Sequence, residues 1–414
     1  MKSEAAKHRP LFGLAPDQTV QGPALFAPCT LRGVTLRNRV VISPMQQYSA
    51  SDCMANDWHL IHLARFALGG AGTVFAGATS VEPRGRNTHG DLGLWHDGQV
   101  EPLARIARIL RTHGAVPGIQ LGHTGRKAGL QKWWEGHGPL NEGDAARGEG
   151  PWPVVGPSAL PMGEGYPVPH ALTEREIGGI VHAYGESARR AFEAGFEMLE
   201  IHAAHGYLIH QFLSPVANRR DDAYGGDFER RQRFALEVVE SVRRNWSTRL
   251  PLSWRLSLTD LDDGSLTREQ LVRFVCALRE RGVDVIDASS GGGISSYPAN
   301  LSRPAGGLDF RAGDGAMIRR EAGIAVLAIG GIVAPEQAEL LLQQGQADLV
   351  ALGREALYNP NWAVHAEAAL GVENAYATWP RPYRMWLAKR AAAADKVRDA
   401  VLLRRLSGNT QAPS

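Results

Sequence analysis

The chain has 414 residues, of which 44% are hydrophobic, and its 45 Lys and Arg nearly balance its 43 Asp and Glu. The hydrophobic fraction is too high for a disordered chain, and no apolar run reaches the roughly 18 residues that a membrane span needs. The net charge of +2 gives no indication of nucleic-acid binding, and the three distant cysteines indicate neither a disulfide framework nor a metal site.

The two ends of the chain differ from its middle. Residues 1–24 lack the apolar core of a secretory signal, so we expect an N-terminal extension and a cytoplasmic protein. Residues 391–414 predict a basic amphipathic helix followed by a polar tail, most often a surface or subunit-packing element. The predicted domain organisation is therefore one domain over residues 25–390 between two short tails.

Between the tails, short runs rich in β-branched residues alternate with longer segments of helical periodicity. The predicted strands are 39–45, 73–80, 116–123, 198–205, 252–258, 283–290, 325–332 and 347–354. The predicted helices are 98–113, 174–194, 229–245, 267–281, 311–322 and 335–344. This α/β pattern predicts a single (β/α)8 TIM barrel and argues against an open doubly wound sheet.

Two long insertions, 124–172 and 206–228, follow the third and fourth predicted strands. In a barrel both leave from the C-terminal face, where active sites are built. Because a structureless loop of this length is unusual inside a compact domain, we expect the insertions to be functional.

The fourth predicted strand ends in polar residues, with His202, His205 and Tyr207 close together. Two neutral imidazoles can donate hydrogen bonds to one oxygen, and a tyrosine beside them is a candidate proton donor. Carbonyl binding is one interpretation; a metal site and a pair of buried structural histidines are the alternatives. HxxH without a third ligand is weak evidence for zinc, and spacing alone leaves all three open.

Arg255 lies in the middle of the apolar fifth strand, and Gln120 lies near the end of the third. A guanidinium there is costly unless an anion meets it, so we expect either a salt bridge to a neighbouring strand or a bound anionic group. The amide of Gln120 could pair with a heterocycle, although alone it indicates little.

The last two strands end in Gly330-Gly331 and Gly353-Arg354. Barrels commonly bind a phosphate between these two loops, where glycine lets backbone N–H groups approach and arginine adds charge-assisted hydrogen bonds. Tight turns at the barrel rim are the alternative. Taken together with Arg255, Gln120 and the His–His–Tyr group, this pattern suits a phosphorylated planar cofactor.

Four motifs resemble the old yellow enzymes, which are FMN-dependent ene-reductases. They are LFAPCTLRGVTLRNRVVISPM (25–45), GGAGTVFAGATSVEPRGR (69–86), QLGHTGRKA (120–128) and HAAHGYLIHQFLSPVANRRDDAYGGDFERRQRF (202–234). DWHLIHLARFALGG (57–70) and PRPYRMWL (380–387) resemble the thermophilic-like branch, which includes xenobiotic reductases. The resemblance implies a TIM barrel that holds FMN at its C-terminal mouth.

The resemblance also implies residue roles. The isoalloxazine and ribityl of FMN would contact Ser43, Pro44, Met45, Ala78, Gln120 and Arg255, and the phosphate would contact Gly330, Gly331, Gly353 and Arg354. His202 and His205 would bind a carbonyl or nitro oxygen of the substrate, and Tyr207 would donate the proton. Tyr48 and Trp386 would line the pocket, the latter from a neighbouring subunit. NADPH or NADH would supply the hydride, and the substrate would be a small molecule.

One position departs from this branch, which typically has cysteine after Ser-Pro-Met. Here the residue is Gln46, whose amide can donate and accept hydrogen bonds and could contact O4 or N5 of the flavin. The redox potential and the substrate range are therefore open, and a desaturase or a specialised pathway oxidoreductase is the alternative function. We further expect a homodimer or a homotetramer.

Overall fold

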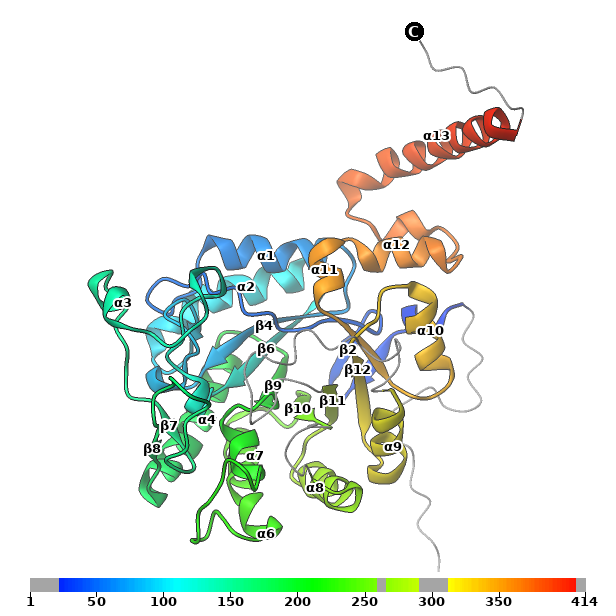
Figure 1. Ribbon diagram of the computed structural model, residues 1–414. Coiled ribbons are helices and arrows are strands. Elements are labelled where there is room, and N and C mark those ends of the chain that lie inside the picture. Colours follow the sequence, from blue (N-terminus) through cyan, green and yellow to red (C-terminus); the bar gives the residue numbers. More distant parts are fainter. Residues whose placement is uncertain (1–21, 259–265, 290–311, 407–414) are drawn as a thin grey trace, which may run out of the picture.

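The computed structural model describes residues 22–258, 266–289 and 312–406. Its centre is a closed barrel of eight parallel strands (Figure 1). In chain order these are β3 (Val40–Ile42), β4 (Thr73–Ser80), β6 (Val116–Gly122), β9 (Met198–Ala203), β10 (Leu252–Ser257), β11 (Val285–Ser289), β12 (Ala325–Ile329) and β13 (Leu349–Leu352). Strand β13 pairs with β3, and β3 pairs with β4, which closes the barrel. The prediction of a (β/α)8 TIM barrel is confirmed.

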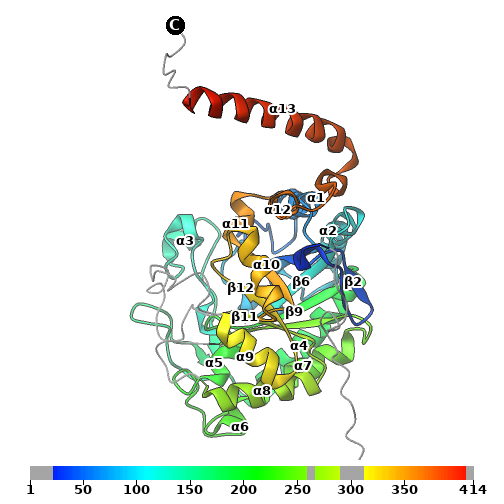
Figure 2. The same ribbon diagram turned by 90° about the vertical axis from the view of Figure 1, so that its right-hand side faces the viewer.

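Helices cover the outside of this barrel (Figures 1 and 2). They are α1 (Asp57–Leu68), α2 (Val100–Thr112), α4 (Glu174–Glu193), α7 (Arg233–Asn245), α8 (Arg268–Glu280), α9 (Ala312–Ala322), α10 (Pro335–Gln343), α11 (Arg354–Tyr358) and α12 (Trp362–Ala369). Each predicted helix is present within a few residues, but α1, α11 and α12 are not among the predicted helices. Helix α1 is the longest of these three. Its inner face carries buried His59 and His62 as well as Leu63 and Phe66, so polar residues interrupt the apolar pattern that identifies a helix.

The hydrophobic core has two parts because successive strand residues face opposite sides. Outside the strands, Trp254 of β10 packs against Phe274 of α8, with ring centroids 6.2 Å apart. Inside the barrel, the cluster that includes Phe75 and Leu327 also contains residues of a hairpin made of β1 (Cys29–Leu31) and β2 (Val34–Leu36). Arg255, next to Trp254, therefore lies on the inner side.

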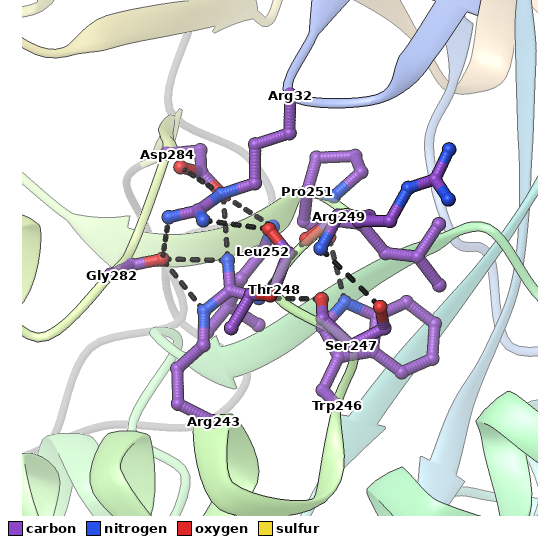
Figure 3. A network of polar contacts seen from close by, with 11 residues as sticks. Arg32, Arg243, Trp246, Ser247, Thr248, Arg249, Pro251, Leu252, Gly282 and Asp284 are labelled. Atoms are coloured by element: carbon purple, nitrogen blue, oxygen red, sulfur yellow. Dashed lines mark hydrogen bonds and ion pairs between the residues drawn. The ribbon is translucent and has the colours of Figure 1, made fainter.

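A charged network fixes this hairpin at the N-terminal ends of β10 and β11 (Figure 3). Arg32 of the hairpin turn donates from Nε to Asp284, 2.7 Å from each carboxylate oxygen. Arg243 of α7 donates to Oδ2 of Asp284 at 2.7 Å, and the backbone N–H of Leu252 does so at 2.9 Å. The carboxylate therefore joins the hairpin, a helix and two strands.

The two insertions follow β6 and β9 at the opposite end of the barrel. The first contains α3 (Glu142–Ala146) and the short strands β7 (Val155–Gly156) and β8 (His170–Ala171); the second contains α5 (Leu208–Leu213) and ends where α6 (Phe228–Arg231) begins. Both thus lie on the C-terminal face, as predicted.

The helix α13 (Arg381–Leu406) projects away from the barrel (Figures 1 and 2). It begins ten residues before the predicted start at 391. Pro382 is its second residue, and proline is tolerated in the first turn of a helix. The predicted extension over 1–24 lies almost entirely outside the described residues. Among the helices described, none is both long and apolar enough to cross a membrane.

Candidate active site

The structure brings together the three polar residues that follow β9. Nδ1 of His205 lies 3.3 Å from Nε2 of His202, and the rings of His202 and Tyr207 stack with centroids 4.4 Å apart. His205 has a φ of 59°, which turns the chain sharply after the strand. The spacing of these residues therefore corresponds to one compact site at the C-terminal end of β9.

The surroundings of both imidazoles favour their neutral form. Burial, followed by the charge of Arg255, lowers the pKa of His202 and of His205 well below the usual value. The backbone N–H of Ala204 lies 3.3 Å from Nδ1 of His202, which must therefore accept, so the ring proton is on Nε2. Nε2 of His205 lies 2.8 Å from Oγ of Ser289. In the part of the chain that is described, no three metal-binding side chains cluster as a metal site requires.

Inside the barrel, beside His202 in the register of β9 and β10, Arg255 is buried and forms an ion pair with Asp287 of β11, with Nη1 and Oδ2 3.6 Å apart. The salt bridge to a neighbouring strand, one of the two predicted possibilities, is therefore present. Gln120 and Ser253 donate to the two carboxylate oxygens of Glu200, at 2.8 and 2.9 Å. Burial and the charge of Asp287 raise the pKa of Glu200 to about 8.

Oγ of Ser43 and Nε of Arg255 are buried near this mouth and make no hydrogen bond within the described residues. Ser43 follows β3 and Arg255 belongs to β10, so the two come from different parts of the barrel. Buried polar atoms without partners are costly and rare. A bound group that offers several hydrogen-bonding atoms, as FMN does, fits both positions.

The glycine pairs lie where β12 and β13 end. Gly330 and Gly331 have φ values of 108° and 69°, which side-chain-bearing residues rarely adopt. Gly353 precedes α11, and Arg354 is the first residue of that helix and is exposed. The backbone turns there, as both the phosphate interpretation and the rim-turn interpretation require.

A cavity that is partly open to solvent lies between the ends of β3 and β4 and the helix α1. Its lining consists of Met45, Gln46, Gln47, Tyr48, His59, His62, Leu63, Gly77, Ala78, Gly90, Asp91 and Leu92. Four predicted site residues are therefore part of one cavity. Sequence reasoning missed His59 and His62, although their spacing of three on one helix face was a usable signal; burial lowers the pKa of each to about 4.

The amide of Gln46 has protein partners at both ends. Its Nε2 donates to Oδ2 of Asp91 at 3.0 Å, and its Oε1 accepts from the hydroxyls of Tyr48 and Tyr207, each at 3.3 Å. Burial raises the pKa of Asp91 to about 6. The predicted contact between Gln46 and the flavin stays a prediction.

The two predicted pocket aromatics differ in position. Tyr48 lines the cavity, and Nε1 of Trp133, from the insertion after β6, donates to its hydroxyl at 3.0 Å. Trp386 lies on the projecting helix α13, with 63% of its surface exposed. Within one chain it is therefore apart from Tyr48, and its predicted role requires a second subunit.

Comparison with known proteins gives a consistent result. Residues 24–373 match the model of the NADH:flavin oxidoreductase / NADH oxidase family. An NADPH dehydrogenase of Geobacillus thermodenitrificans is 42% identical over 351 residues, which cover 84% of this chain and 95% of the relative. An NADH:flavin oxidoreductase of Gibberella zeae is 39% identical over 389 residues, covering 89% of this chain and 92% of the relative.

Solved structures agree with these relatives. Morphinone reductase has a TM-score of 0.68 at 27% identity, over 85% of this chain and 91% of its own. A complex of morphinone reductase with tetrahydroNAD has a TM-score of 0.65 at 26% identity, over 85% and 92% of the two chains. The chain therefore belongs to the NADH:flavin oxidoreductase / NADH oxidase family, that of the old yellow enzymes, and is an FMN-dependent NAD(P)H oxidoreductase.

Proposed function

We propose that the protein reduces the activated C=C bond of α,β-unsaturated carbonyl or nitro compounds. The observation that carries this proposal is the convergence of two neutral imidazoles and one phenol, His202, His205 and Tyr207, at the end of β9. Such a group suits a substrate that carries an oxygen to be polarised and a carbon to be protonated.

The two histidines bind and polarise the substrate oxygen in this proposal. The proton on Nε2 of His202 faces Nδ1 of His205 at 3.3 Å, and in this proposal the substrate oxygen takes the place of that ring nitrogen as its acceptor. Hydrogen-bond donors that are fixed in a buried site stabilise the negative charge that develops on the oxygen during reduction. Because both rings are neutral, they donate hydrogen bonds without transferring a full proton to that oxygen.

Tyr207 is the proposed proton donor, through its hydroxyl, to the carbon next to the carbonyl or nitro group. Stacking on His202 holds its ring beside the oxygen-binding residues. A positioned general acid of this kind typically contributes a factor of about 10² to 10⁴ in rate.

Residues at the mouth would hold FMN, which supplies the hydride chemistry when bound. The proposed contacts to its ring system and ribityl are Ser43, Pro44, Met45, Gln46, Ala78, Gln120 and Arg255, and those to its phosphate are Gly330, Gly331, Gly353 and Arg354. The unpartnered atoms of Ser43 and Arg255 support the first set. The positive φ values of Gly330 and Gly331 are compatible with the second.

A homodimer or a homotetramer is part of the proposal. The exposed Tyr383, Met385 and Trp386 on α13 support it, because they give the projecting helix an apolar stretch. We also retain the proposed domain, residues 25–390, between its two tails.

Anaerobic stopped-flow spectroscopy tests the function. The enzyme is first reduced with NADPH or NADH and then mixed with 2-cyclohexenone, a nitroalkene or cyclohexanone. We expect rapid reoxidation by the first two and none by the saturated ketone. Tyr207→Phe should slow reoxidation by 2-cyclohexenone about 10²-fold or more and leave reduction by NADPH unchanged. Turnover of saturated ketones with oxygen alone would instead establish the desaturase.

A further inference from the structure

Three segments that are distant in sequence meet through Gln46, which follows β3. Asp91 stands just before the short strand β5 (Leu92–Gly93), and Tyr207 follows β9. We propose that Asp91 is a positioning residue that acts through Gln46 to fix the hydroxyl of Tyr207. The inference rests on the proposed role of Tyr207 as the proton donor.

A backbone group determines how the Gln46 amide is oriented. The N–H of Asn87 donates to Oδ2 of Asp91 at 2.6 Å, so this oxygen must be an acceptor. Nε2 of Gln46 lies 3.0 Å from the same oxygen and is therefore its second donor. The carbonyl Oε1 is then directed to the other side, toward Tyr207. Because the backbone N–H of Asn87 can only donate, the side-chain amide of Gln46 is prevented from flipping.

The phenol of Tyr207 is held at two points. Its ring stacks on His202 at 4.4 Å, and its hydroxyl donates to Oε1 of Gln46 at 3.3 Å. The same oxygen accepts from Tyr48, whose own hydroxyl accepts from Trp133. Stacking alone allows the ring to slide in its plane, whereas the second contact fixes the distance of the hydroxyl from β3. A misplacement of about 1 Å can cost roughly 10²-fold in rate.

The proposed positioning role also explains why the carboxylate of Asp91 is buried, although the proposed chemistry does not use it directly. Asp91 is 4% exposed, and its other oxygen accepts from Thr88 at 2.9 Å. The contacts with Asn87 and Thr88 tie its own loop together, but the contact with Gln46 reaches a different segment. A purely local role would not require this third contact.

The test uses the holoenzyme with 3-fluorotyrosine in place of tyrosine. The ¹⁹F resonance of residue 207 is assigned as the one that is missing from the spectrum of Tyr207→Phe. The variants are Asp91→Ala, Gln46→Met and the double variant, with Asp91→Asn and Thr88→Val as controls. Asparagine can keep an acceptor oxygen facing Asn87 and Gln46, whereas Thr88→Val removes only contacts within the loop, those with Asp91 and with the N–H of Gly90. Reoxidation of the NADPH-reduced enzyme by 2-cyclohexenone is measured in parallel.

We expect Asp91→Ala and Gln46→Met each to move the Tyr207 resonance and to slow reoxidation roughly tenfold or more, with no further change in the double variant. Asp91→Asn and Thr88→Val should resemble the wild type. An unmoved resonance in Asp91→Ala, or effects that add in the double variant, would overturn the positioning role. If the wild type reduces no enone, the proposed function fails, and the ¹⁹F measurement still decides whether Asp91 positions Tyr207.

Discussion

Asp284 should be a major determinant of stability at the end of the barrel opposite the active site. The Asp284→Asn substitution keeps the shape of the side chain and one acceptor oxygen, but it removes the charge that faces two guanidinium groups (Figure 3). Arg243 is the more buried partner, with 10% of its side chain exposed against 28% for Arg32. Burial lowers the pKa of Arg243 to about 10, and the charge of Asp284 opposes this lowering.

The size of the effect follows from this difference in burial. Removing one partner of a buried ion pair typically costs about 3–5 kcal/mol, whereas a partly exposed pair contributes about 1 kcal/mol or less. Because asparagine can still accept from the N–H of Leu252, we expect the lower part of the range, about 3 kcal/mol of unfolding free energy. The hairpin β1–β2 should then detach more easily.

Urea unfolding at a fixed excess of FMN measures this loss, since bound cofactor itself adds stability. Arg249→Ala is the matched control, because this arginine is exposed on the same loop and its side chain makes none of the contacts drawn in Figure 3. It should change the free energy by no more than about 0.5 kcal/mol. Reduction by NADPH should be unchanged in both variants while they are folded. A loss below about 1 kcal/mol in Asp284→Asn would refute the reasoning.

Three further substitutions test the active-site end. Burial raises the pKa of Asp91 to about 6 from 3.8, so the native state binds this proton more tightly than the unfolded state does. The contribution of this proton to the unfolding free energy is therefore fully present below pH 3.8 and is lost as the pH rises through 6. In urea, the unfolding free energy of the wild type should therefore fall by about 3 kcal/mol relative to Asp91→Asn across this interval. Arg255→Met removes the guanidinium that is proposed to contact FMN, so FMN should be lost on gel filtration; full retention of FMN would contradict the assignment. Gln46→Cys, too short to reach both Asp91 and Tyr207, should shift the flavin midpoint potential, and an unchanged potential would place position 46 away from the ring.

The barrel could be predicted because its signals are local. Strands such as β4 are continuous runs of small and β-branched residues, and the predicted range 73–80 coincides with the observed one. Helix α4 begins with Thr173 and Glu176, a capping box that marks its start in the sequence. Helix α1 has an equivalent cap at Asn56, but two histidines occupy its buried face. A polar residue that becomes neutral on burial cannot be distinguished from a surface residue by periodicity alone.

Site residues could be predicted only where a single strand and the residues just after it contain the whole pattern. His202, His205 and Tyr207 are near one another in the sequence, and Arg255 stands out as a charge in an apolar strand. Asp91 lies in the polar stretch Arg86–Asp91, where a carboxylate is unremarkable until folding brings Gln46 to it. The ion pair between Arg255 and Asp287 likewise depends on the register of β10 and β11, which the sequence of either strand does not contain.

The two ends of the barrel use buried charge in opposite ways. At the N-terminal end, the carboxylate of Asp284 accepts from two arginines and a backbone N–H, so charge there contributes to stability. At the C-terminal mouth, Arg255 makes longer contacts, to Ser289 at 3.4 Å and to Asp287 at 3.6 Å. Nε of Arg255 and Oγ of Ser43 make no hydrogen bond in the part of the chain described. Unpaired buried groups cost stability, and a protein retains them where a ligand supplies the partners. Binding of FMN should therefore stabilise this protein more than its buried apolar area alone would suggest, and removing the hydroxyl in Ser43→Ala should reduce that gain while leaving the FMN-free chain as stable as before or more so.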